Sequence, residues 1–130
     1  MITDNDIEEA KKRTDYGRGI PKADRLHEHP DCVRIAYQWF DAQKKIKTKT
    51  WDGTSLKSKI EYWAGRYVSA ADVAVAAELH PRIYGKYPEF NISKNHIEPS
   101  VQRLSDIPEA MTQMDYRERH DPSRYKSSEV

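Results

Sequence analysis

Cysteine is almost absent from this chain of 130 residues, in which Cys32 stands alone. A single cysteine cannot form an intrachain disulfide, so the sequence excludes a small secreted domain that depends on disulfides for its stability. A zinc site of the finger type is also missing, because His27 and His29 have no second pair of ligands at a suitable spacing. We therefore expect neither a metal nor another cofactor.

Long apolar runs are missing as well. No stretch approaches the roughly 20 residues that a membrane-spanning helix needs. The first ten residues, MITDNDIEEA, are acidic where a secretory signal peptide would be basic and then apolar. We expect a cytoplasmic protein with no membrane partner. Apolar residues make up 37% of the chain, below the usual share of about 45–50%, so the core of a single domain must be small.

The chain also lacks a net charge of either sign. Its 22 Lys and Arg residues nearly balance its 21 Asp and Glu residues, so no global basic field draws the protein to nucleic acid. A local excess exists nevertheless, because six lysines between residues 44 and 59 have only Asp52 as an acidic neighbour in that interval. Any nucleic-acid binding would have to come from this kind of local patch.

Motifs of known catalytic sites are absent too. The sequence contains no glycine-rich phosphate loop, no G-x-S-x-G turn and no H-E-x-x-H helix. Paired carboxylates such as Glu8 and Glu9 occur in polar flanks, where solvent would leave their chemistry ordinary. We therefore expect a protein that is not an enzyme.

What the chain does contain is helical periodicity. Pro30 suits the first position of a helix that runs to about residue 45. Apolar residues from Leu56 to Tyr67 recur at the spacing of one helical face, and Ser69 with Asp72 forms a capping box for a helix over 70–79. A shorter polar helix over 4–13 begins at Thr3, and a further helix begins at Pro99.

These elements predict an all-α fold, a small bundle of four to five short helices that includes a helix-turn-helix-like pair. Residues 1–25 are interpreted as an N-terminal arm, 26–114 as the helical domain and 115–130 as a polar C-terminal tail, extended or disordered. Residues 45–57 fit either a hairpin turning at Asp52-Gly53 or a lysine-rich loop, and the loop is favoured. The predicted core consists of Val33, Tyr37, Phe40, Leu56, Ile60, Trp63, Tyr67, Val73, Leu79, Val101 and Leu104.

The helix over 70–79 and the later segment ISKNHI suggest a function. A capped, alanine-rich helix comes first, and a segment with a serine near its start and several polar side chains follows it. This order resembles a helix-turn-helix arrangement. The resemblance implies a regulatory DNA-binding protein in which Lys94, Asn95 and His96 face base edges. The loop RIYGKYP adds cations interleaved with tyrosines, a combination suited to phosphates and bases. The predicted DNA-binding residues are Lys44, Lys45, Lys47, Lys49, Lys57, Arg82, Tyr84, Lys86, Lys94, Asn95 and His96.

A second hypothesis has nearly equal support. The chain would be a non-enzymatic adaptor or inhibitor, of the kind that phages and plasmids encode, and would dock on a larger protein through Tyr84, Tyr87 and Phe90. The same tyrosines could instead fold back over the small core. The sequence leaves a homodimer open.

Overall fold

The structure, a computed structural model, describes residues 2–17, 20–50 and 55–125. A three-stranded antiparallel sheet accompanies the helices, so the expectation of an all-α bundle is wrong. The elements in chain order are α1 (Asp4–Arg13), η1 (Lys22–Asp24), α2 (Pro30–Ala42), β1 (Lys45–Thr50), α3 (Ser55–Ala64), α4 (Ala70–Leu79), β2 (Gly85–Lys86), β3 (Glu89–Ile92), η2 (Val101–Leu104), α5 (Met114–Arg117) and η3 (Pro122–Arg124), where η marks a 3₁₀ helix.

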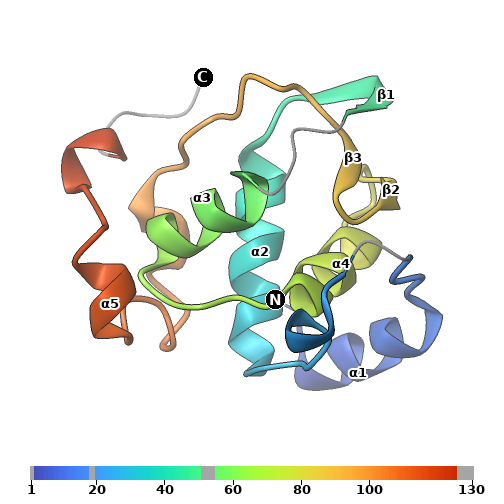
Figure 1. Cartoon of the computed structure of the whole chain (residues 1–130), viewed down its shortest axis with the longest axis horizontal. Helices are drawn as coiled ribbons and strands as arrows, with labels where there is room; N and C mark the ends of the chain where they lie inside the picture. Colours follow the sequence, from blue (N-terminus) through green and yellow to red (C-terminus); the bar gives the residue numbers. More distant parts are fainter. Residues whose placement is uncertain (1, 18–19, 51–54, 126–130) are drawn as a thin grey trace.

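Helix α2 runs through the middle of the molecule, with α3 and α4 beside it (Figure 1). Pro30 occupies its first turn as predicted, and the His29 side chain caps it by accepting a hydrogen bond from the Asp31 amide. Helix α4 is buried along Ala70 to Ala77. Its alanines let α2 approach closely, because a narrow helix leaves room for the larger side chains of its neighbour.

The sheet corrects two expectations about residues 45–57. Residues 45–50 form a strand and not a loop, and their partner is β3, some 40 residues further along the chain, with Lys45 opposite Ile92 and Thr50 opposite Phe90. Strand β2 pairs with the other edge of β3, so β3 is central. The alternation of Lys with Ile and Thr suits an edge strand. The Asp52-Gly53 turn lies outside the described residues.

The predicted helix-turn-helix pair is not formed. After α4 the chain enters the β2–β3 hairpin, and residues 93–100 are irregular where a recognition helix was expected. The helix expected from Pro99 is one 3₁₀ turn that begins at Val101, with Ser100 as its cap. Val101 is 38% exposed and so does not belong to the core. Two prolines at 99 and 108 bracket this stretch, which leaves little room for a longer helix.

The core itself lies between α2, α3, α4 and the inner face of the sheet. Val33, Phe40, Ile60 and Trp63 are fully buried, which confirms their predicted positions. Tyr37, Tyr67 and Leu79 are half-buried. No helix in the described part of the chain has the length and apolar character to cross a membrane.

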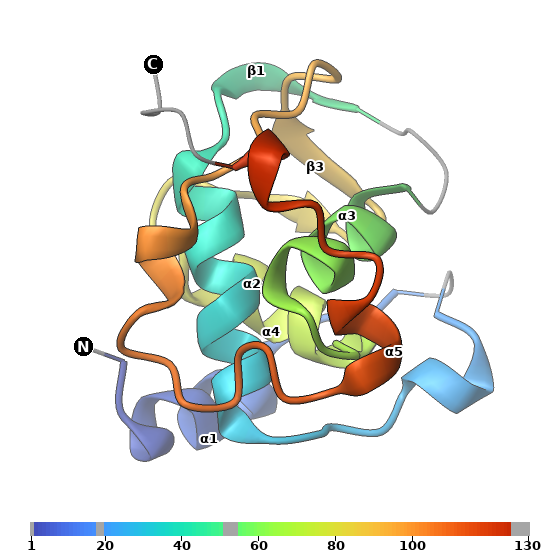
Figure 2. The ribbon, with the colours of Figure 1, turned by 90° about the vertical axis from the view of Figure 1, so that its left-hand side faces the viewer.

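Both ends of the chain pack on this core. The capping box predicted at Thr3 and Asp6 is present, and α1 buries Ile7 and Ala10, mainly against α4. At the other end α5 lies near α3 (Figure 2), and Tyr125 beyond it is buried. The residues interpreted from sequence as arm and tail thus contribute apolar side chains to the domain.

Candidate nucleic-acid interface

Asn91 in the central strand β3 fixes the segment that precedes the hairpin. The Tyr84 amide donates to Asn91 Oδ1 at 2.7 Å, and Asn91 Nδ2 donates to the Arg82 carbonyl at 2.9 Å. The neighbours of Asn91, Phe90 and Ile92, point to the opposite side of the strand, where Phe90 packs edge-on against Phe40. Asn91 thus fixes the backbone of residues 82–84 beside β3; the Ile83 side chain is buried, whereas Tyr84 is exposed on the outer face of the sheet.

The Tyr84 ring lies across this outer face. Its hydroxyl donates to the Lys47 carbonyl on β1. Tyr84 immediately precedes β2, and β3 separates β2 from β1, so the side chain spans the width of the sheet. The residue remains 49% exposed. The hydrogen bond to Lys47 thus fixes an aromatic ring that remains half exposed.

Lys45, Lys47 and Lys49 alternate along β1, but the pairing of β1 with β3 shifts register between Lys45 and Thr50. The Lys45 ammonium turns toward α2, where it donates to the Asp41 carbonyl at 2.7 Å. Lys49 lines an open hollow of about 690 Å³ together with Tyr84 and Lys86. Burial and the nearby Arg82 charge lower the pKa of Lys45, which places Arg82 within electrostatic reach of β1.

We call this surface the basic face and extend it to the adjoining end of the sheet. There the Ser93 amide donates to the Lys44 carbonyl at 3.0 Å, so Lys44 and Lys94 are close. No described carboxylate pairs with Lys44, Lys47, Lys49, Arg82 or Lys94, whereas Lys86 meets Asp15 at 2.8 Å in an exposed pair. The basic face comprises Lys44, Lys45, Lys47, Lys49, Arg82, Tyr84, Lys86 and Lys94.

Several predicted residues lie elsewhere. The Lys57 ammonium is 2.8 Å from Glu61 Oε2 and 4.5 Å from the centre of the Tyr67 ring, so its charge is engaged inside the fold. Tyr87 and Phe90 are 5% and 1% exposed and belong to the core. Asn95 is exposed beside Lys94. The His96 side chain is turned toward α3, where it meets Lys59 at 3.0 Å.

His80 fixes the position of Arg82 in the basic face, a role that was not predicted from the sequence. Its Nδ1 accepts a hydrogen bond from the Arg82 amide at 3.1 Å, so the proton is on Nε2, which donates to Asp41 Oδ1 at 2.9 Å. Burial lowers the pKa of His80 although the Asp41 carboxylate acts in the opposite direction. The neutral ring therefore holds Arg82 in place.

This arrangement predicts a pH-dependent stability. Because the folded pKa of His80 is below the ordinary value of about 6.5, the unfolded chain binds more protons below that pH, and stability falls as the pH drops through it. His80→Asn keeps an acceptor for the Arg82 amide but does not titrate. We expect the thermal midpoint to fall less between neutral pH and pH of about 5 in this variant. Equal falls in variant and parent, followed by circular dichroism, would contradict the assignment.

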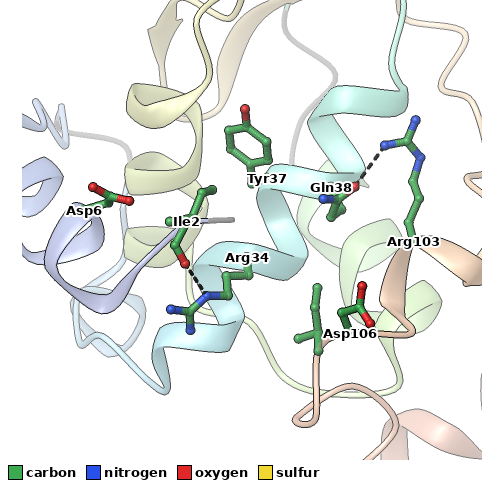
Figure 3. Close-up of a pocket in the computed structure, with 8 residues that line it drawn as sticks. Ile2, Asp6, Arg34, Tyr37, Gln38, Arg103 and Asp106 are labelled. Carbon is green, nitrogen blue, oxygen red and sulfur yellow. Dashed lines mark hydrogen bonds between the residues drawn. The ribbon is translucent and has the colours of Figure 1, made fainter.

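A second hollow, of about 450 Å³, lies between α1, α2 and η2 (Figure 3). Arg34 and Arg103 stand on two sides of it. Arg34 already binds Asp31 at 2.8 Å, and Arg103 already binds Asp41 and Gln38 at 3.0 Å. Asp31 and Asp41 neutralise the two guanidinium groups. This hollow therefore has no excess of positive charge to bind a phosphate backbone.

Comparisons of the chain with models of protein families, with curated protein sequences and with solved structures find no match. Within residues 2–17, 20–50 and 55–125, no group of three or more His, Cys, Asp or Glu side chains could hold a metal ion. A function is therefore proposed from the geometry of the described residues.

Proposed function

We propose that the protein binds single-stranded DNA, in the cytoplasm, through the basic face. The observation that carries the proposal is the half-exposed Tyr84 ring, held by its hydrogen bond to β1, a strand whose Lys47 and Lys49 have no described carboxylate partner. A flat aromatic ring beside lysines suits a strand whose bases are unpaired, since each base can stack while its phosphate meets a cation. The irregular segment 93–100 provides no helix for the major groove, so duplex readout receives no support.

The two kinds of contact make separable contributions. Stacking of one base on an aromatic side chain contributes about 1–3 kcal/mol to binding. Each phosphate that a lysine neutralises releases counterions, which adds about 0.7 to the slope of log affinity against log salt for a single strand. Binding through this face should therefore weaken steeply with salt and should tolerate changes of base sequence.

Removing three lysines tests the electrostatic part. In the variant with Lys44→Gln, Lys47→Gln and Lys49→Gln, we expect the salt slope to fall by about 2, because three phosphate contacts are lost. The measurement is fluorescence anisotropy of a short labelled single strand titrated at several salt concentrations. A duplex of the same sequence is expected to bind more weakly.

A matched control carries Lys11→Gln, Lys12→Gln and Lys22→Gln, which changes the net charge equally at residues of α1 and η1. It should keep the parental slope. If both triple variants lose affinity alike, binding reflects net charge and the basic face is not the site. Absence of binding at the lowest salt would end the proposal.

Docking on a larger protein remains the alternative. Of the three side chains on which it rests, Tyr84 is the one at the surface, so an aromatic cluster of the kind that anchors protein interfaces is not assembled there. The exposed apolar side chains Leu26, Val101 and Met114 come from three separate segments. This alternative therefore has less support, and a partner retained from a nuclease-treated lysate would restore it.

A further inference from the structure

A small, fairly enclosed pocket lies beside the segment 96–99. Its volume is about 150 Å³, and four parts of the chain contribute to it: α2, α3, the segment after β3, and η3 with Tyr125. Trp39 and Tyr125 form apolar walls and are buried. The polar side chains that line the pocket are Lys59, Tyr62, His96, Glu98 and Arg124. Segments this far apart in sequence converge here on a cavity that can enclose a small group.

Lys59 and His96 form a hydrogen-bonded pair at one side of this pocket. Their Nζ and Nδ1 atoms are 3.0 Å apart. An ammonium group can only donate, so His96 Nδ1 accepts and the ring proton is on Nε2. The ring is held edge-on to Trp39, at 5.1 Å between centres and 84° between planes. No carboxylate in the described part of the chain pairs with Lys59, which lines the pocket.

Positive groups outnumber negative ones around the pocket. Arg124 binds Glu98, the one acidic side chain among the lining residues. Arg119 donates to the Tyr62 hydroxyl at 2.9 Å and lies over the Tyr62 ring. One carboxylate uses part of the five donors of a guanidinium group, so Arg124 can bind a second anion. Among the lining residues, Lys59 and Arg124 thus stand against Glu98 alone.

We propose that this pocket binds a phosphate monoester group. Ammonium and guanidinium donors that come from two different segments, Lys59 of α3 and Arg124 of η3, suit a tetrahedral anion with several oxygens better than a flat carboxylate, which one guanidinium satisfies alone. Lys94 and Asn95 connect the basic face to His96 along the chain. The group has two sources: the terminal phosphate of a bound DNA strand, which rests on the function proposed above, or a free phosphate compound.

Titration of the full chain with inorganic phosphate tests the site directly. We expect saturable binding by calorimetry, together with a shift of the His96 side-chain resonances in histidine-selective NMR spectra. Lys59→Gln should weaken this binding about tenfold or more, the effect of one lost charge-assisted hydrogen bond. Lys22→Gln, which removes an equal charge on η1 outside both the pocket and the basic face, should leave it unchanged.

Arg124→Lys is a second test, which remains informative if Lys59→Gln fails to fold. It keeps the charge at an exposed position but removes the guanidinium fork, so it should also weaken phosphate binding while its thermal midpoint stays near that of the parent. Inorganic phosphate that leaves the His96 resonances unmoved would overturn the proposal. An equal loss in Lys22→Gln would overturn it as well, because diffuse attraction would then explain the binding.

Oligonucleotides distinguish the two sources. Strands that carry a 5′-phosphate, a 3′-phosphate or no terminal phosphate are compared by anisotropy. Tighter binding of one phosphorylated strand, abolished by Lys59→Gln, identifies the end of the strand as the ligand. Binding of inorganic phosphate without any preference among the strands identifies a free phosphate compound. If inorganic phosphate binds but no strand does, the DNA proposal fails while the pocket stands.

Discussion

Replacing Trp63 by alanine should lower the free energy of unfolding by about 3–5 kcal/mol, which is enough to unfold much of a domain whose total stability is about 5–15 kcal/mol. The Trp63 ring in α3 is fully buried, and no described group accepts a hydrogen bond from its Nε1. The loss is therefore one of packing, since truncation leaves a cavity and breaks no hydrogen bond. Denaturant unfolding followed by circular dichroism measures it.

Trp63→Phe is the matched control. It keeps an aromatic ring in the cavity and removes a buried N–H that has no described partner, so part of the lost packing is offset by the removal of an unsatisfied polar group. We expect a destabilisation well below that of the alanine variant. An alanine variant that unfolds at the same denaturant concentration as the parent would show that the core is not centred on α3.

Gly85→Ala should open the β2–β3 hairpin. Gly85 has a φ of +121°, and a Cβ atom there would lie 2.1 Å from the backbone oxygen of Glu89. Strain in that region costs about 1–3 kcal/mol, and the clash with backbone adds a similar amount. We expect a total loss of roughly 2–5 kcal/mol, and a loss of DNA binding as well, because the hairpin positions Tyr84.

Gly17→Ala provides the comparison. Gly17 also has a positive φ, of +67°, but the nearest atom to an added Cβ is 3.6 Å away, so the substitution costs only the left-handed conformation, about 1–2 kcal/mol. Thermal melts and anisotropy separate the two effects. If Gly85→Ala binds the strand with parental affinity, the position of Tyr84 does not matter and the ring is not a stacking platform.

The parts of the fold that the sequence predicts are those set by neighbours in the chain. The capping box at Thr3, the Ser69 cap and the proline at the start of α2 act within one helical turn, so they can be found without tertiary information. At Ser69 the predicted box is only half formed, because the Asp72 carboxylate binds His27 and the Glu28 amide instead. The sheet depends on pairing Lys45 with Ile92. Strand β3 is four residues long, too short for its alternation of Phe90, Asn91 and Ile92 to stand out from a loop.

The residues of the candidate site also divide into those that the sequence predicts and those that depend on the fold. The lysines of β1 and the cations around Tyr84 could be predicted from composition, because charged side chains rarely leave the surface. The roles of Asn91 and His80 could not, since both bind the segment 82–84 from positions set by the sheet and by α4. Lys57 is different, because Glu61, one helical turn away, engages it, and such an i,i+4 pair can be predicted from the sequence.

Strand β1 also forms one border of the sheet, and such borders tend to recruit strands from other copies of a protein. Closely spaced lysines discourage that recruitment, because two copies would bring like charges together. A polyanion that covers these lysines, or their replacement by glutamine, removes the repulsion. The lysines proposed to hold DNA thus also disfavour pairing of this edge with a second copy of the chain.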